Sequence, residues 1–246
     1  MPKRRLIVLQ NDQAWNDYLI EAFNDTPSTP EIVTSAAAAP PLIRQGNPDV
    51  VFANPSLLTA PLTAALRMHR TSNADFRVFR LGFSSAASAS IYPFDDSFNE
   101  IPPSLYDFQK QLAHHLPLPD PIRLLIVDDE PGVGEIFQDY FDHRTQPTFI
   151  VETAKNGVEA EVKTQKQPPH VLILDIKMPE RDGRELYREL RRRETAPPTI
   201  VFFDLVSSDE VLEIRKWGSP AFVEKGSRSS AMPEMAALIK KLTYFG

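Results

Sequence analysis

Val171-Leu172-Ile173-Leu174-Asp175 is the stretch that decides the fold, because four apolar residues run directly into a carboxylate. A wholly apolar run of this length is typical of a strand buried on both faces of a parallel sheet. An earlier run, Leu124-Leu125-Ile126-Val127, ends in the same way, with Asp128 and Asp129. The carboxyl ends of parallel strands meet at one edge of the sheet, where open α/β sheets place their sites. We therefore expect Asp128, Asp129 and Asp175 to lie together.

Three carboxylates at one sheet edge repel one another. Two unit charges about 4 Å apart interact by about 4 kcal/mol at an effective dielectric constant of about 20. A hard cation relieves this repulsion, and Mg²⁺ suits the position because it takes one or two carboxylates together with waters and a phosphate oxygen. The pattern predicts a magnesium-dependent phosphoryl-transfer site.

The composition narrows the class of protein. A length of 246 residues favours two domains of ordinary size, and 42% hydrophobic with 24% charged residues is typical of a globular chain. The absence of cysteine excludes disulfides and thiolate chemistry. No apolar run approaches the roughly 20 residues of a membrane span. The net charge of −6 argues against direct nucleic-acid binding as the main activity. We expect a cytoplasmic protein with no membrane or nucleic-acid partner.

The chain repeats its own pattern about one domain length apart. Arg5-Leu6-Ile7-Val8-Leu9 matches Arg123-Leu124-Leu125-Ile126-Val127, and the segment 48–54 matches the segment 169–175. Alternate prolines between His114 and Pro121 break a helix and favour an extended connector. We expect two domains, residues 1–117 and residues 118–246.

Strand and helix patterns alternate, which indicates a parallel α/β sheet covered on both faces. In the second half we expect strands at 124–127, 149–153, 171–174, 199–203 and 221–224, and helices at 132–141, 158–165, 184–193, 209–217 and 232–242, the fourth helix ending at Gly218 as a C-cap. In the first half we expect strands at 6–9, 31–34, 50–53, 77–81 and around 90–92, helices at 14–23 and 105–115, and low-complexity stretches at 36–41 and 84–90.

Residues 122–244 resemble a response-regulator receiver domain of two-component signalling. Three segments carry the resemblance in order and spacing: Leu125-Ile126-Val127-Asp128-Asp129-Glu130, the run from Asp175 to Gly183, and Phe222-Val223-Glu224-Lys225. The resemblance implies a flavodoxin-like fold, a five-stranded parallel sheet of order 2-1-3-4-5 with helices on both faces. With the repeat, it implies two such domains in tandem.

The resemblance also implies roles for individual residues. Asp175 would accept a phosphoryl group from a phosphohistidine of a partner kinase or from a small phosphodonor. Asp128 and Asp129 would hold Mg²⁺ with Asp175, and the backbone carbonyl of Lys177 would add a ligand. Lys225 would pair with the phosphoryl oxygens. A cation and an ammonium are what a carboxylate needs to approach a dianionic group. The domain would thus phosphorylate itself and would not be an enzyme acting on a separate substrate.

Two positions depart from the family pattern, which puts the usual switch in doubt. Phe203 stands where the family has a Thr or Ser that donates to the phosphoryl group, and phenylalanine has no donor. Gly226 follows Lys225, where the family usually has proline. Phe222 occupies the position of the family's mobile aromatic, and core packing explains it equally well. We expect phosphorylation of Asp175 with an atypical conformational response.

The first half resembles a degenerate receiver, a pseudo-receiver without the chemistry. Gln10 and Asn11 stand at the acid-pair positions and Asn54 at the acceptor position. No lysine stands near 91–94, where the counterpart of Lys225 is expected. We expect this half to serve as a docking or dimerisation module. A plainer alternative is that it only stabilises its neighbour.

The first hypothesis for the whole chain is a response regulator that signals through protein contacts. Its expected partners are a histidine kinase or phosphotransfer protein, a downstream protein or effector domain, and a second copy in a homodimer. Two alternatives are a regulatory fragment of a longer response regulator and a phosphorylation-independent scaffold. A haloacid-dehalogenase-like phosphatase needs a second aspartate where Lys177 stands. A flavodoxin-like flavin protein would meet repulsion between its phosphate and Asp128-Asp129-Glu130.

Overall fold

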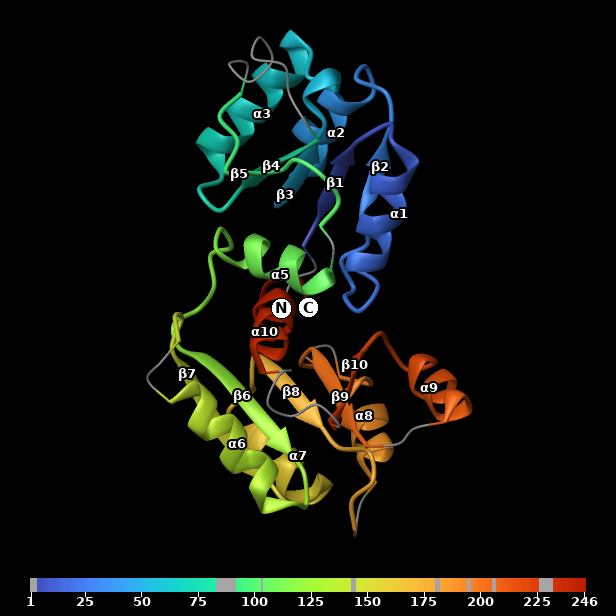
Figure 1. Ribbon diagram of the computed structural model, residues 1–246, viewed down its shortest axis with the longest axis vertical. Helices are drawn as coiled ribbons and strands as arrows, with labels where there is room; N and C mark the ends of the chain where they lie inside the picture. Colours follow the sequence, from blue (N-terminus) through green and yellow to red (C-terminus); the bar gives the residue numbers. More distant parts are fainter. Residues whose placement is uncertain are drawn as a thin grey trace. The chain divides into compact units, whose positions relative to one another are not determined.

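The chain forms two compact units, one of residues Pro2–Pro117 and one of residues Leu118–Tyr244, each with its own five-stranded sheet (Figure 1). The computed structural model describes residues 4–82, 92–102, 104–142, 145–179, 182–193, 196–204, 207–225 and 232–246. Every strand pairing in both sheets is parallel.

The second unit has the strand order β10-β9-β8-β6-β7. Counted from its own first strand and read from the β7 edge, this is the order 2-1-3-4-5. Its strands are β6 (Ile122–Val127), β7 (Phe149–Ala154), β8 (Val171–Leu174), β9 (Thr199–Phe203) and β10 (Ala221–Glu224). Its helices are α6 (Pro131–Phe141), α7 (Gly157–Lys166), α8 (Gly183–Leu190), α9 (Ser208–Arg215) and α10 (Met232–Phe245). The predicted flavodoxin-like fold is confirmed for this half.

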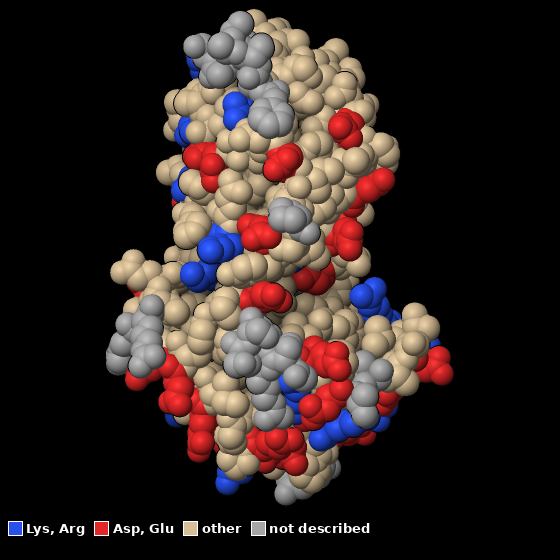
Figure 2. All heavy atoms as spheres, in the orientation of Figure 1, with Lys and Arg blue, Asp and Glu red and all other residues tan. Residues whose placement is uncertain are grey.

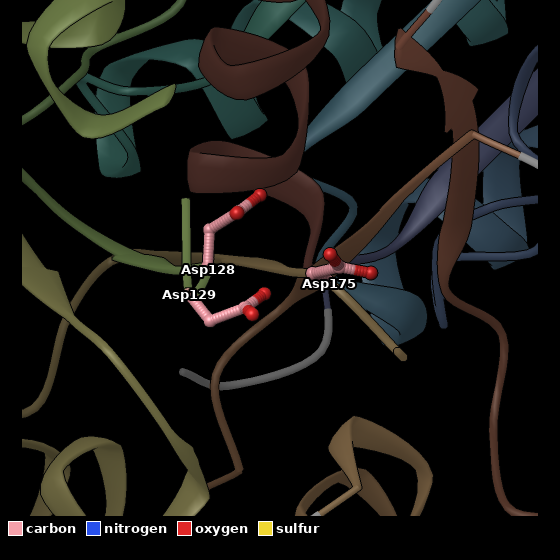
Figure 3. A group of neighbouring side chains, drawn as sticks. All are labelled: Asp128, Asp129 and Asp175. Carbon is pink, nitrogen blue, oxygen red and sulfur yellow. The ribbon is translucent and has the colours of Figure 1, made fainter. Parts of the chain in front are cut away.

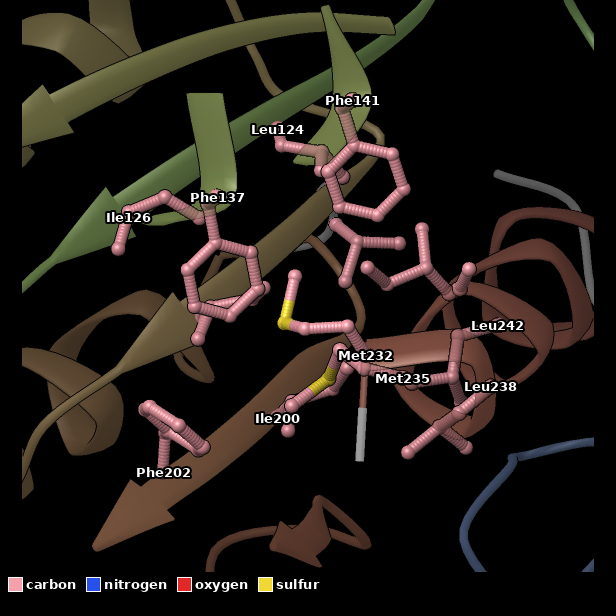
Figure 4. Packing of buried hydrophobic residues seen from close by; sticks show 14 of the residues in the cluster. Leu124, Ile126, Phe137, Phe141, Ile200, Phe202, Met232, Met235, Leu238 and Leu242 are labelled. Atoms are coloured by element: carbon pink, nitrogen blue, oxygen red, sulfur yellow. The ribbon is translucent and has the colours of Figure 1, made fainter. Parts of the chain in front are cut away.

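Helices cover both faces of this sheet because alternate strand residues point to opposite sides. On one face, side chains of β6, β8 and β9 pack against Phe137 and Phe141 of α6 and against Met232 and Met235 of α10 (Figure 4). On the other face, Leu172 and its neighbours pack against the apolar stripes of α7, α8 and α9. β8 is therefore apolar at every position, and β6 is apolar from Leu124 to Val127, directly before its acidic end.

The first unit has the order β2-β1-β3-β4-β5, which is the same 2-1-3-4-5 topology. Its strands are β1 (Leu6–Leu9), β2 (Glu31–Val33), β3 (Val50–Ala53), β4 (Arg77–Leu81) and β5 (Asp96–Phe98). Its described helices are α1 (Gln13–Ala22), α2 (Ala39–Gly46), the short 3₁₀ helix η1 (Pro55–Leu57), α3 (Ala60–Ser72) and α5 (Leu105–Ala113). The receiver-type fold predicted for this half is confirmed as well.

Two expected elements are wrong in position. The strand predicted around 90–92 lies instead at Asp96–Phe98, since the carboxylate of Asp95 accepts from Val78 N at 2.6 Å and starts the pairing with β4 there. Ser90 falls outside the described residues, as does the low-complexity stretch 84–90. In the second unit, α9 ends at Arg215 with Lys216 as its C-cap. Gly218 serves close packing, because a Cβ there would lie 2.6 Å from Tyr187 Oη.

Two helices of the first unit escaped prediction, α2 and α3. Both carry proline in their first turn, where the missing N–H costs nothing because it has no partner within the helix. The stretch 36–41, expected as low complexity, therefore includes the start of α2.

On the face shown in Figure 2, Lys and Arg side chains lie scattered among acidic and uncharged residues. Figure 2 shows that Asp and Glu side chains recur over the second unit on the face in view. Among the described residues, no helix is long and apolar enough to cross a membrane.

Candidate metal centre

The three aspartates reach one place because β6 and β8 are neighbours and end at the same edge. The pairing of β6 with β8 aligns Val127 with Leu174, the residues that immediately precede Asp128 and Asp175. Asp175 N donates to Val127 O at 2.8 Å, and Asp128 N donates to Ala154 O at 3.0 Å. The two buried aspartates, Asp128 and Asp175, are thus each fixed by a hydrogen bond of their own backbone.

The carboxylates of Asp128, Asp129 and Asp175 each offer one oxygen to a group whose atoms all lie within 4.8 Å of one another. Asp128 and Asp129 extend from the end of β6, and Asp175 comes from the neighbouring strand end (Figure 3). Asp128 and Asp175 are buried, whereas Asp129 is exposed. The predicted cluster is therefore open on one side, as a site that admits a substrate must be.

Lys225 follows β10 and brings the fourth charge into the cluster. Its Nζ lies 2.7 Å from Asp175 Oδ2 and 3.0 Å from Asp128 Oδ2, and its side chain is 1% exposed. Burial acts to lower the pKa of this lysine, but the hydrogen bonds and charges of Asp175 and Asp128 outweigh it and leave the pKa raised. The ammonium therefore stays charged between the two buried carboxylates.

The two oxygens of the Asp128 carboxylate have different partners. Its Oδ1 accepts from Glu130 N at 2.9 Å, while the buried Oδ2 lies 3.0 Å from the Lys225 ammonium. Burial raises the pKa of Asp128 above its usual range. Three carboxylates with a single ammonium leave an excess of negative charge, which fits a hard cation with oxygen ligands.

The turn after β8 holds Asp175 by close backbone packing. Asp175 Oδ1 accepts from Lys177 N at 2.9 Å. Gly183 N donates to Ile176 O, and a Cβ on Gly183 would lie 2.0 Å from Asp175 O. Only glycine fits here, so Gly183 shapes the turn that follows β8.

The two aromatic positions of the expected switch lie together. The rings of Phe203 and Phe222 meet edge to face with centroids 6.4 Å apart. The guanidinium of Arg215 lies 5.6 Å from the centre of the Phe222 ring. Phe222 thus has aromatic and cationic neighbours, and Phe203 brings no hydroxyl to the cluster. Gly226 falls outside the described residues.

The matching edge of the first unit is held by neutral amides. Gln10 Oε1 accepts from Asn11 N, from Asp12 N and from Asn54 Nδ2, the last at 2.8 Å. Asn99 directly follows β5, so Asn99, rather than a residue of 91–94, corresponds to Lys225. This correction leaves the first unit without a lysine at that position.

The comparisons with known proteins agree with this geometry. A family model described as the response regulator receiver domain matches residues 124–237. This part of the chain belongs to the response regulator receiver domain family. The match places the second half of the chain in two-component signalling.

Relatives of the receiver domain are response regulators. The transcriptional regulatory protein TrcR of Mycobacterium tuberculosis is 37% identical over 93 residues, which are 38% of this chain and 34% of TrcR. The response regulator Rre1 of Synechocystis sp. is 33% identical over 108 residues, 43% of this chain and 46% of Rre1. The matches thus span less than half the length of either relative.

Among solved structures, the response regulator domain of Thermotoga maritima CheB is 24% identical and covers 50% of this chain and 96% of its own, with a TM-score of 0.45.

Sequence reasoning missed one charged group beside the site. Arg184 binds the carboxylate of Asp182 with Nε and Nη2, at 3.0 and 2.6 Å, and directs Nη1 toward α9. No motif signalled its contact with α9, because Glu210 and Glu213 belong to a separate helix.

Proposed function

We propose that the second unit is a magnesium-dependent phosphoacceptor of a response regulator, with Asp175 as the accepting residue. The observation that carries the proposal is the cluster itself: three carboxylates within 4.8 Å, with Lys225 paired to the two buried ones. Together with the family match, this arrangement favours phosphoryl transfer over the flavin-binding and dehalogenase-like alternatives.

The residues divide the work. A carboxylate oxygen of Asp175 attacks the phosphorus of a phosphohistidine or of a small phosphodonor, the P–N or P–O bond to the donor breaks, and an aspartyl phosphate forms. Lys225 already contacts Asp175 and is placed to pair with the incoming phosphoryl oxygens. Asp128, Asp129, Asp175 and the carbonyl of Lys177 would hold Mg²⁺, which when bound supplies positive charge to both reacting anions.

We propose that the first unit, residues 1–117, contributes a surface and no chemistry. Its acceptor position is Asn54, whose amide is hydrogen-bonded to Gln10 and cannot serve as a carboxylate nucleophile. Docking of a downstream protein or pairing with a second copy are the roles that such a unit can fill. A cytoplasmic histidine kinase or phosphotransfer protein is the proposed upstream partner.

The test is direct. The protein is incubated with Mg²⁺ and acetyl phosphate, and separately with beryllofluoride, and the adduct is followed by intact mass and by ¹⁹F NMR. We expect one phosphoryl group per chain in the first case and a bound fluoride signal in the second, each abolished by chelation of Mg²⁺. Asp175→Asn should remove both signals.

Asp139→Asn is the matched control, since Asp139 is exposed on α6 and is no part of the cluster. A modification that survives Asp175→Asn, or one that forms equally well with the magnesium chelated, would sink the assignment. If the adduct forms but neither oligomeric state nor the fluorescence of either half responds, the chain is the scaffold that Phe203 suggests.

A further inference from the structure

We propose that α9 is coupled to the acceptor position by an ionic bridge through Arg184, in place of a hydroxyl on β9. The inference rests on the proposed function of Asp175. It assigns to Arg184, Glu210 and Glu213 the task of passing a change at the acceptor to the surface that α9 presents.

The first step of the coupling is backbone contact. The Gly183 backbone lies so close to Asp175 O that not even a methyl group fits between them. Gly183 opens α8, and Asp182 is the N-cap of that helix, its carboxylate accepting from Arg184 N at 2.8 Å. A displacement of the acceptor strand end therefore moves the start of α8.

The second step is the contact of the Arg184 guanidinium with both α8 and α9. The guanidinium is planar and its donors keep a fixed geometry. Two of its nitrogens, Nε and Nη2, hold Asp182. The third nitrogen, Nη1, lies 3.7 Å from Glu210 Oε1 and 3.8 Å from Glu213 Oε2. The side chain thus joins the start of α8 to α9.

The third step is the rigidity of α9 at its start. Ser207 and Glu210 form a capping box, in which each side chain bonds the backbone of the other residue. Glu210 therefore belongs both to the bridge and to the cap. A displacement of Glu210 therefore displaces the first turn of α9.

The Phe222 ring, at the position of the family's mobile aromatic, is held by neighbours on two elements. Phe222 packs edge to face on Phe203 and faces the Arg215 guanidinium of α9. No donor stands on the Phe203 side chain to contact a phosphoryl group. The ionic bridge through Arg184 is a polar connection between the acceptor turn and α9, and the charge of Lys177 in that turn also acts on Glu210.

A reporter lies next to α9. Trp217 comes two residues after the end of α9, is packed on the core of that face and carries Arg188 over its ring at 5.8 Å. The sequence has two tryptophans, so Trp15→Phe leaves Trp217 as the single emitter. In this full-length background, beryllofluoride with Mg²⁺ is titrated while Trp217 emission and the ¹⁹F signal are recorded.

Arg184→Gln breaks the bridge at its centre and Glu213→Gln breaks it at the α9 end. Arg192→Gln removes the same charge from an exposed side chain beyond the end of α8 and is the control. We expect both bridge variants to form the adduct but to lose most of the Trp217 response. Coupling is reciprocal, so beryllofluoride affinity should change by about two- to five-fold, the size typical of partly exposed ion pairs.

Wild-type Trp217 response and wild-type affinity in both bridge variants would overturn the proposal. So would a Trp217 response lost equally in Arg192→Gln. Two variants are used because either one alone could unfold α9, and a melting curve of each shows whether it did. A parent protein that gives no ¹⁹F adduct would instead overturn the proposed function, and this inference would fall with it.

Discussion

Asn54 Nδ2 donates a hydrogen bond to Gln10 Oε1 at 2.8 Å, and these two residues stand where the receiver half has Asp175 and Asp128. In the receiver half the corresponding carboxylates do not bond each other and share the buried ammonium of Lys225. The same topology thus carries neutral amides at this sheet edge in one unit and charged carboxylates in the other. Amides satisfy each other directly, whereas carboxylates need a cation between them.

Asn54→Asp is expected to destabilise the first unit without creating a second acceptor. The change places two carboxylate or carbonyl oxygens 2.8 Å apart, and no lysine follows β5 to separate them. We expect the free energy of unfolding to fall by about 1–3 kcal/mol, measured by urea denaturation. Asn73→Asp is the control, because that half-buried side chain accepts from Asp75 N and a carboxylate does the same. A second phosphoryl group in the intact mass would contradict this account.

Lys225→Met is expected to lower the free energy of unfolding, and to lower it further in the absence of magnesium. The change leaves Asp128 and Asp175 buried with no ammonium between them, and breaking a buried ion pair costs about 3 kcal/mol. Mg²⁺ at saturating concentration binds only the folded state, so it should restore part of the lost free energy of unfolding. Urea denaturation with Mg²⁺ and with a chelator measures both values, and the exposed Lys216→Met should change neither. An equal loss under both conditions would show that no cation site remains.

Gly183→Ala is expected to disturb the acceptor turn, because its Cβ would lie 2.0 Å from Asp175 O and the backbone must shift. We expect a clear loss of stability, about 2 kcal/mol or more, with weaker beryllofluoride binding. Gly132→Ala is the matched control, since nothing lies within 4 Å of its Cβ and alanine favours the helix by about 0.5–1 kcal/mol. Similar melting temperatures for the two variants would refute the close-packing argument.

The stability of the receiver half should rise with pH in the range just below pH 6.5 through His170. Burial, assisted by the charge of Arg123, lowers the pKa of His170 from 6.5, and its Nδ1 accepts from Arg123 N at 3.0 Å. In that range His170 is protonated in the unfolded chain but stays neutral in the folded chain. The stability that neutral His170 contributes is therefore fully present above pH 6.5 and is lost as the pH falls. His170→Gln should flatten this part of the profile, followed by urea midpoints at several pH values. An unchanged slope would exclude His170 as its source.

Sequence reasoning succeeded where burial alone fixes the structure. The bounds of β8 and β9 are as predicted, because β8 is wholly apolar and β9 is apolar after Thr199. The meeting of Asp128 with Asp175 followed from parallel pairing, which brings strand ends to one edge. These features depend on local pattern and topology and not on side-chain detail.

Sequence reasoning failed where contacts between distant segments decide. No helix was expected at α2 or α3, whose first turns contain Pro40 and Pro61. The position of β5 depends on Asp95 accepting from Val78, which no alternation of residues reveals. The Arg184 bridge requires α8 and α9 to lie side by side, and ion pairs between helices leave no pattern in the chain.

The neutral edge around Gln10 has a thermodynamic consequence. A site without ionised side chains exchanges neither protons nor cations on unfolding, so it adds no dependence on pH or magnesium to the stability of its unit. With magnesium bound as proposed, the receiver edge adds both. Changes in magnesium concentration are thus expected to alter the folding equilibrium of the receiver unit. The corresponding edge of the first unit leaves the stability of that unit unchanged.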